Sequence, residues 1–95
     1  MVRATLDGIV IAESEETKKV EGNHYFPRSA LKEECFVESL KTTHCGWKGA
    51  ASYLHVSVNG TKHENLAWFY PEPLDAAKEI EGHVAFYSKV KITEG

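Results

Sequence analysis

The six residues from His44 to Gly49 hold the most reactive group of side chains in the sequence. His44-Cys45-Gly46-Trp47-Lys48-Gly49 combines an imidazole, a thiol, an indole ring and an ammonium group. Lys48 can bind a carboxylate or a phosphate as a point charge, and a neighbouring cation favours the thiolate of Cys45. Trp47 can stack on the ring of a ligand. A structural role competes with this interpretation, because turns need glycine and tryptophan and cysteine are often core residues.

The catalytic candidates in this segment are His44, Cys45 and Lys48. Nucleophilic catalysis by a thiol also requires a base placed beside it and an oxyanion site. The sequence shows neither, so an enzyme remains an alternative. Five histidines suggest a metal site, but the chain lacks Cys-x-x-Cys and His-x₃-His spacing. We therefore expect no metal and no other cofactor.

Aromatic segments supply the candidate binding residues. Trp68-Phe69-Tyr70 precedes Pro71, and alternation on a strand would place Trp68 and Tyr70 on one face and Phe69 on the other. One of these faces would pack in the core while the other lines a cleft. Together with the 44–49 segment, these motifs predict one aromatic-lined pocket. Its expected ligand-binding residues are His24, Tyr25, Trp47, Lys48, Trp68, Tyr70 and His83.

The elements that must position these residues are mostly strands. Asp7-Gly8 and Asn59-Gly60 predict tight hairpins, because type I′ turns need positive φ at both central residues. We expect another turn at Gly22-Asn23, one or two helical turns capped by Ser29 and reaching Glu34, and a short helix that begins at Pro73 and ends just before Gly82. The pattern predicts strands at 2–6, 9–13, 17–21, 36–40, 52–58, 61–64, 66–70, 84–88 and 90–92. This layout favours a mainly β, compact antiparallel domain with one or two short helices.

Length and composition limit the function. The chain has 95 residues, which is one domain spanning 1–95. A net charge of −3 argues against nucleic-acid binding, and the longest apolar run, 66–70, is too short for a membrane span. Two cysteines do not make a disulfide framework, and no signal-peptide pattern is present. We expect a cytoplasmic protein with reduced thiols.

Four motifs carry a resemblance to a known family. They lie at 20–27, 42–49, 67–73 and 82–87, and in this order and spacing they resemble the family described as domain of unknown function 427 over nearly the whole chain. The resemblance implies a fold similar to the β-tent group, which includes methionine-R-sulfoxide reductases. Gly46 stands where the family usually has proline, and Leu54 and Phe69 stand where it often has tyrosine.

The family also carries a nucleotidyltransferase label, which would imply nucleotidyl transfer. That reaction requires magnesium held by carboxylates and a cradle for phosphates. The sequence has no Gly-x-x-x-x-Gly-Lys loop, and Glu13, Glu15 and Glu16 lie in an expected surface turn. The residues themselves thus give this label no support.

The leading hypothesis is a small domain that binds a small organic ligand, anionic if Lys48 supplies the binding charge. One alternative is an enzyme that uses His44, Cys45 and Lys48. Another is a protein-interaction module with exposed aromatic residues and strand edges. We expect a monomer or a weak homodimer.

Overall fold

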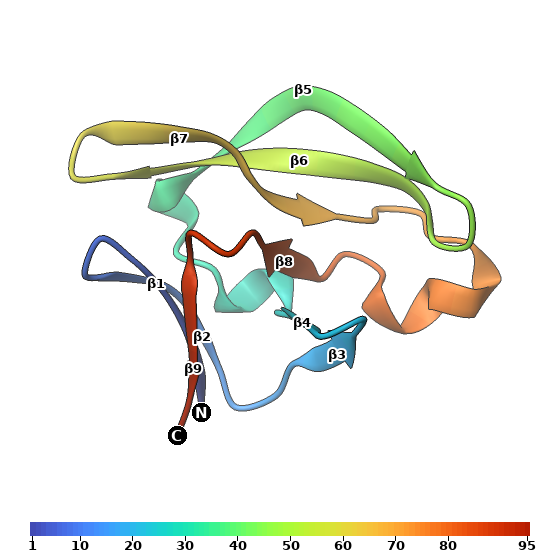
Figure 1. Cartoon of the computed structure of the whole chain (residues 1–95), viewed down its shortest axis with the longest axis horizontal. Helices are drawn as coiled ribbons and strands as arrows, with labels where there is room; N and C mark the ends of the chain where they lie inside the picture. Colours follow the sequence, from blue (N-terminus) through green and yellow to red (C-terminus); the bar gives the residue numbers. More distant parts are fainter.

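Hairpins build most of this fold. The computed structural model describes residues 1–95. The strands are β1 (Val2–Leu6), β2 (Ile9–Ser14), β3 (Lys18–Val20), β4 (Asn23–Tyr25), β5 (Phe36–Cys45), β6 (Gly49–Val58), β7 (Thr61–Phe69), β8 (Val84–Phe86) and β9 (Lys91–Glu94). Three short 3₁₀ helices, η1 (Arg28–Ala30), η2 (Glu33–Cys35) and η3 (Asp75–Ile80), connect them. The long β5–β6–β7 layer crosses over the remaining strands (Figure 1).

The strands form three antiparallel sheets. Their orders are β2-β1-β9, β3-β4 and β5-β6-β7-β8. The expectation of a mainly β, antiparallel fold is confirmed, and the only helices are of the 3₁₀ type. No helix is long and apolar enough to cross a membrane.

The predicted tight turns are confirmed at two hairpins. Asp7 and Gly8 have φ of 49° and 81°, and Asn59 and Gly60 have φ of 50° and 76°. A third turn of this kind lies one residue earlier than expected. Positive φ falls at Glu21 (52°) and Gly22 (80°), because Asn23 already belongs to β4.

Two helix predictions need correction. The helix expected after Pro73 is a 3₁₀ helix, and it is kinked at Ala77, where φ is −120° and ψ is 19°. Ser29 caps nothing, because Pro27 takes the N-cap position of η1 and no side chain caps it. Ser29 instead lies inside this three-residue turn, and the ring of Pro27 fixes φ at the residue that precedes the turn.

Irregular residues lengthen two of the predicted strands. The segments 61–64 and 66–70 join into β7 through Asn65, which has φ of 54°. The pairing with β6 shifts register here, and His55 Nδ1 accepts a hydrogen bond from the Asn65 amide at 3.0 Å. Strand β5 continues past residue 40 to Cys45, across a register shift at which Leu40 is 102% exposed. Such irregularities disrupt a ladder locally without ending the strand.

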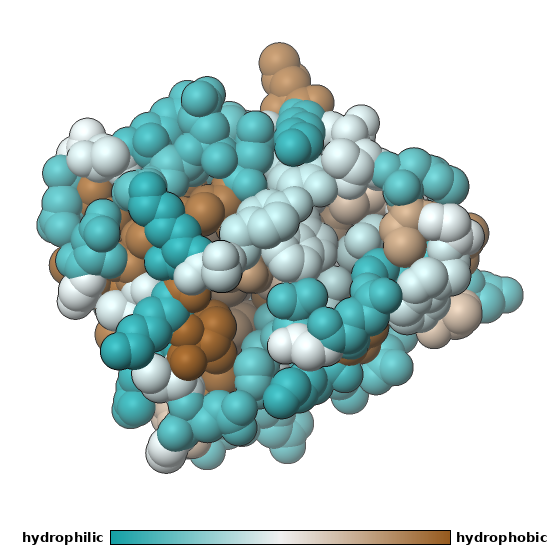
Figure 2. Space-filling view, viewed as in Figure 1, coloured by the Kyte–Doolittle hydropathy of each residue, from teal (hydrophilic) through white to brown (hydrophobic).

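The four-stranded sheet packs a different core on each face. On one face Leu54 pairs with Ala67 and Ala67 with Phe86, and these residues join the larger core with β1 and β2. Apolar side chains are visible between β6–β7 and the β1–β2 hairpin (Figure 2). On the other face Tyr53 pairs with Trp68, within a smaller cluster rich in tyrosine. Both faces are covered, which is why both Tyr53 and Leu54 are buried.

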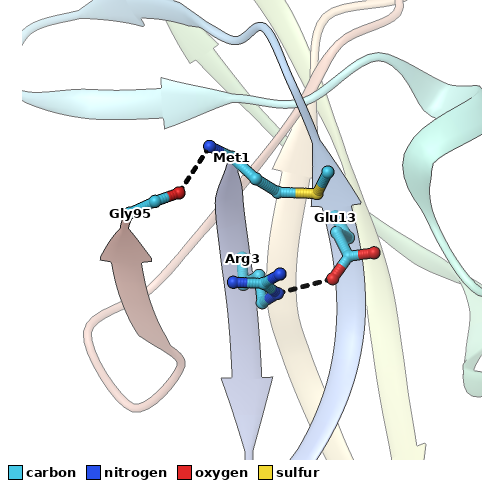
Figure 3. Close-up of polar contacts among 4 residues, drawn as sticks. All are labelled: Met1, Arg3, Glu13 and Gly95. Atoms are coloured by element: carbon cyan, nitrogen blue, oxygen red, sulfur yellow. Dashed lines mark hydrogen bonds and ion pairs between the residues drawn. The ribbon is translucent and has the colours of Figure 1, made fainter.

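The two chain ends meet in the β2-β1-β9 sheet. The Met1 amino group donates a hydrogen bond to the Gly95 carbonyl at 2.7 Å, and Arg3 Nε lies 2.6 Å from Glu13 Oε2 on β2 (Figure 3). Strand β9 pairs with β1 from Val2↔Glu94 to Thr5↔Lys91. This sheet therefore closes the larger core with the two ends of the chain.

Candidate functional site

The turn between β5 and β6 positions the most reactive residues. Cys45 and Gly49 pair across it, and Gly49 has φ of 105°, a conformation that side chains other than glycine rarely adopt. The Lys48 carbonyl accepts a hydrogen bond from the Leu74 amide at 2.9 Å. This bond holds the turn against the segment that leads into η3, at the right of Figure 1.

Lys48 is the buried charge of this region. Its side chain is 9% exposed, and its ammonium forms an ion pair with Glu21, which comes from the turn between β3 and β4. Nζ lies 5.2 Å from the centroid of the Trp47 ring and 5.6 Å from that of Tyr70, distances at which cation–π attraction contributes. Burial by itself lowers the pKa of Lys48. The hydrogen bond to Glu21, together with the electrostatic effects of Tyr25, Tyr70 and Glu21, outweighs burial, so the pKa is raised. Lys48 is therefore charged at neutral pH.

Tyrosines and tryptophan surround this ammonium. The Tyr25 hydroxyl accepts a hydrogen bond from Trp68 Nε1 at 3.1 Å, and the two rings meet edge to face, with centroids 6.3 Å apart. Burial raises the pKa of both Tyr25 and Tyr70, while the charge of Lys48 opposes this in each. Both hydroxyls therefore keep their protons and remain available as hydrogen-bond donors. We call Tyr25, Trp47, Lys48, Trp68 and Tyr70 the Lys48 cluster.

The aromatic surface continues along the same face of the sheet. Trp68 and Tyr87 have ring centroids 4.6 Å apart, and Tyr53 stacks on Tyr87 at 6.5 Å. The Tyr53 hydroxyl lies 2.9 Å from Thr43 Oγ1 and 3.4 Å from the Tyr87 hydroxyl. The bond to Tyr53, together with burial, raises the pKa of Tyr87 to about 12. Lys41 Nζ lies 4.8 Å from the centroid of Tyr53.

Cys45 lies at the edge of the cluster and His44 does not. The thiol packs against the tyrosine-rich core, and its pKa is lowered by the backbone N–H groups of Trp47 and Lys48, with a smaller effect of the Lys48 charge. Neighbouring residues of a strand point to opposite faces. His44 therefore faces away from Cys45 and is exposed, which leaves the thiol without that imidazole as its base.

His24 and His83 lie in a separate place. Both line a cleft of about 390 Å³ together with Thr17, Pro27 and Glu94, among others. His24 Nδ1 lies 2.6 Å from Thr17 Oγ1, and its Nε2 lies 3.0 Å from Glu94 Oε2. His83 Nδ1 donates to the Glu81 carbonyl at 3.0 Å. Because His24 and Tyr25 are neighbours on β4, their side chains point to opposite faces.

The structure thus divides the residues predicted for one pocket into two groups. The Lys48 cluster holds five of them, and the cleft holds His24 and His83. The cleft is the only hollow of appreciable size in the molecule, so the Lys48 cluster is a packed group with no open cavity beside it.

Comparison with protein families assigns nearly the whole chain to one family. The sequence model of the family described as Domain of unknown function (DUF427) matches residues 1–94. The chain belongs to the DUF427 family. No curated protein matches it.

In this DUF427 chain, the motifs converge although they lie far apart in sequence. Segment 20–27 contains the β3–β4 turn and β4, segment 42–49 the end of β5 and the β5–β6 turn, and segment 67–73 the end of β7 and the residues that follow it. The sequence motifs did not identify Glu21 as the partner of Lys48, or Thr43 and Lys41 as neighbours of Tyr53 on the same face of the sheet. Alternation would have placed Thr43 on the face of Cys45, but a glutamate in a surface turn gives no signal of a buried partner.

The DUF427 residues do not fit the magnesium site that nucleotidyl transfer would need. No group of three or more His, Cys, Asp or Glu side chains among the 95 residues lies close enough to hold a metal ion. Transfer of a nucleotidyl group relies on carboxylate-held metal to neutralise the phosphates.

Proposed function

We propose that this protein binds a small organic anion at the Lys48 cluster. One observation carries the proposal. The Lys48 ammonium is buried among the rings of Trp47 and Tyr70, and its ion-pair partner, Glu21, comes from an exposed turn. Removing a charge from water is unfavourable unless the charge is compensated. A buried cation beside aromatic rings therefore suits an anionic ligand that carries apolar surface.

The neighbouring groups support this assignment. Small-molecule sites combine mostly apolar walls with a few polar groups that orient the ligand. Here Trp47 and Tyr70 supply flat surfaces, and the protonated hydroxyl of Tyr70 supplies a donor. Tyr70 forms no hydrogen bond within the chain that would compete for it. The ammonium supplies the charge that selects an anion.

Ligand screening by thermal shift tests the proposal. The panel contains nucleotides, sugars and carboxylates, and the variant is Lys48→Met, which keeps an unbranched side chain one atom shorter and removes its charge. The control is Lys62→Met on β7, because Lys62 is exposed and belongs to no ion pair. We expect anions to raise Tm for the wild type and the control and not for Lys48→Met. Equal shifts in all three proteins would contradict the proposal.

A second candidate function is nucleophilic chemistry at Cys45, and the lowered pKa of its thiol favours it. The rate of alkylation by iodoacetamide reports the thiolate fraction. In Cys35→Ser, which leaves Cys45, the rate should reach half its maximum below pH 9.0, the ordinary value for a thiol. In Cys45→Ser the midpoint should lie above it, because burial raises the pKa of Cys35. The same midpoint for both thiols would remove this candidate.

A further inference from the structure

We infer that Glu21 occupies the place of the ligand's acidic group, so that the site takes an aromatic carboxylate and the β3–β4 turn moves aside when the ligand binds. This inference rests on the proposed function, since it names the ligand class and the regulation of the same site. No open cavity lies beside the Lys48 cluster, and the Glu21 carboxylate contacts the Lys48 ammonium. A side chain of the protein fills the place that a ligand would need.

The chemistry of the partner points to a carboxylate. Lys48 Nζ contacts Glu21 Oε1, so the group that now satisfies the buried ammonium is itself a carboxylate. The hydrogen bond from Lys48 lowers the pKa of Glu21 against the opposing effect of desolvation, and the charge of Lys48 and the Trp47 side chain add to the lowering. A carboxylate from a ligand would take over the same ion pair, so the ammonium would be compensated in both the free and the bound protein.

The surroundings of Lys48 point to an aromatic ring on that carboxylate. Trp47 is 42% exposed although its ring lies beside the buried ammonium, and Tyr87 is also exposed next to Trp68. Exposed rings at the rim of a charged site offer flat surface for stacking. Saturated or strongly hydrated anions such as inorganic phosphate would leave these rings unused.

Glu21 can leave its place without becoming buried elsewhere. Its side chain is 51% exposed while paired, so release returns the carboxylate to water, where a charge is well solvated. The turn that carries it belongs to a two-stranded sheet, and β3 and β4 have three residues each. Short, two-stranded sheets of this kind have little stability of their own. Tyr25 on β4 is fully buried and Phe26 pairs with Val84, so β4 stays in place, and the exposed turn at Glu21 and Gly22 is the part of the site that can open.

Titration with sodium benzoate tests the inference, with binding followed by ¹⁵N NMR. The variants are Glu21→Gln, which keeps the shape of the side chain, and Glu21→Gly, which removes it and suits the positive φ of the turn. Glu64→Gln on β7 is the matched control, because Glu64 is exposed and unpaired. If the paired turn leaves the site open in about a tenth of molecules, removing Glu21 tightens benzoate binding about tenfold. Glu64→Gln should bind benzoate as the wild type does.

Further arms separate the two proposals. Benzamide, which has the ring without the charge, should gain nothing from Glu21→Gly, and inorganic phosphate should bind more weakly than benzoate. Lysine-dependent benzoate binding that is equal in the wild type and both Glu21 variants would overturn the inference and leave the proposed function standing. Benzoate binding that persists unchanged in Lys48→Met, or benzoate binding to none of the proteins, would overturn the inference, and the thermal-shift panel would then decide the proposed function by itself.

Discussion

Replacing Gly49 by alanine is expected to destabilise the protein by about 2 kcal/mol. Gly49 has φ of 105°, well beyond the left-handed helical region near 57° that other residues sometimes visit. A Cβ at this position would lie 3.4 Å from the Leu74 amide nitrogen and 3.5 Å from Leu74 Cγ. These are ordinary van der Waals distances, so the expected loss comes from the backbone and not from a clash.

Gly46 provides a control within the same turn. Its φ is not positive, and a Cβ there would meet no atom within 4 Å. Gly46→Ala should therefore be neutral, or stabilise by up to about 1 kcal/mol because alanine restricts the unfolded chain. Urea unfolding followed by tryptophan fluorescence measures both variants. For a domain of this size, the loss at Gly49 corresponds to a fall in Tm of about 8–16 °C.

The difference in the free energy of unfolding between the two glycine variants tests the conformation of the turn. If Gly49→Ala and Gly46→Ala have free energies of unfolding within about 0.5 kcal/mol of each other, the conformation assigned to this turn is wrong. The thiol gives a second measurement. Because the N–H groups of Trp47 and Lys48 lower the pKa of Cys45, distortion of the turn by Gly49→Ala should move its alkylation midpoint upward, and Gly46→Ala should not.

Two further predictions concern the tyrosines. Folding raises the pKa of Tyr87 from 10.0 to about 12, so the unfolded chain loses this proton at a lower pH than the folded chain does. The free energy of unfolding should therefore be constant below pH 10 and fall as pH rises towards 12. Tyr87→Phe should flatten that fall in urea unfolding measured across this range. An equally steep fall in the variant would show that other groups cause it. Tyr25→Phe removes the acceptor of the Trp68 indole N–H and should lower the free energy of unfolding by about 1 kcal/mol. Tyr70→Phe removes a hydroxyl without a partner in the chain and should lower it by less. The two variants are compared by urea unfolding and by the Trp68 indole resonance, and an unmoved resonance in Tyr25→Phe would contradict the bond.

Local chemistry explains the parts of the fold that were predictable. The Asp7-Gly8 and Asn59-Gly60 hairpins follow from the conformational freedom of those residues, and positive φ is found at all four. Alternation correctly separated Phe69 from Trp68, since Phe69 packs against the larger core and Trp68 against the smaller one. Both signals depend only on neighbours in the chain.

Predictions failed where a local signal had more than one outcome. Ser29 and Pro73 indicated helical starts, yet the turns near them are 3₁₀ helices: η1 has only three residues, and η3 is interrupted by the kink at Ala77. Asn65 in a strand-like segment indicated a break, whereas the structure keeps β7 continuous through an irregularity. Its amide is satisfied by the side chain of His55, a partner ten residues away.

The sequence by itself determined the antiparallel β class, the hairpin turns, the aromatic content of the central segments and the membership of the DUF427 family. Only the tertiary structure decided which of those side chains meet. Glu21 and Lys48 lie 27 residues apart, and their ion pair joins the β3–β4 turn to the β5–β6 turn, a meeting that no local sequence pattern encodes. Strand β4 lies between the cleft and the Lys48 cluster. His24 therefore points to the cleft and Tyr25 to Lys48, because neighbouring side chains of a strand point to opposite faces.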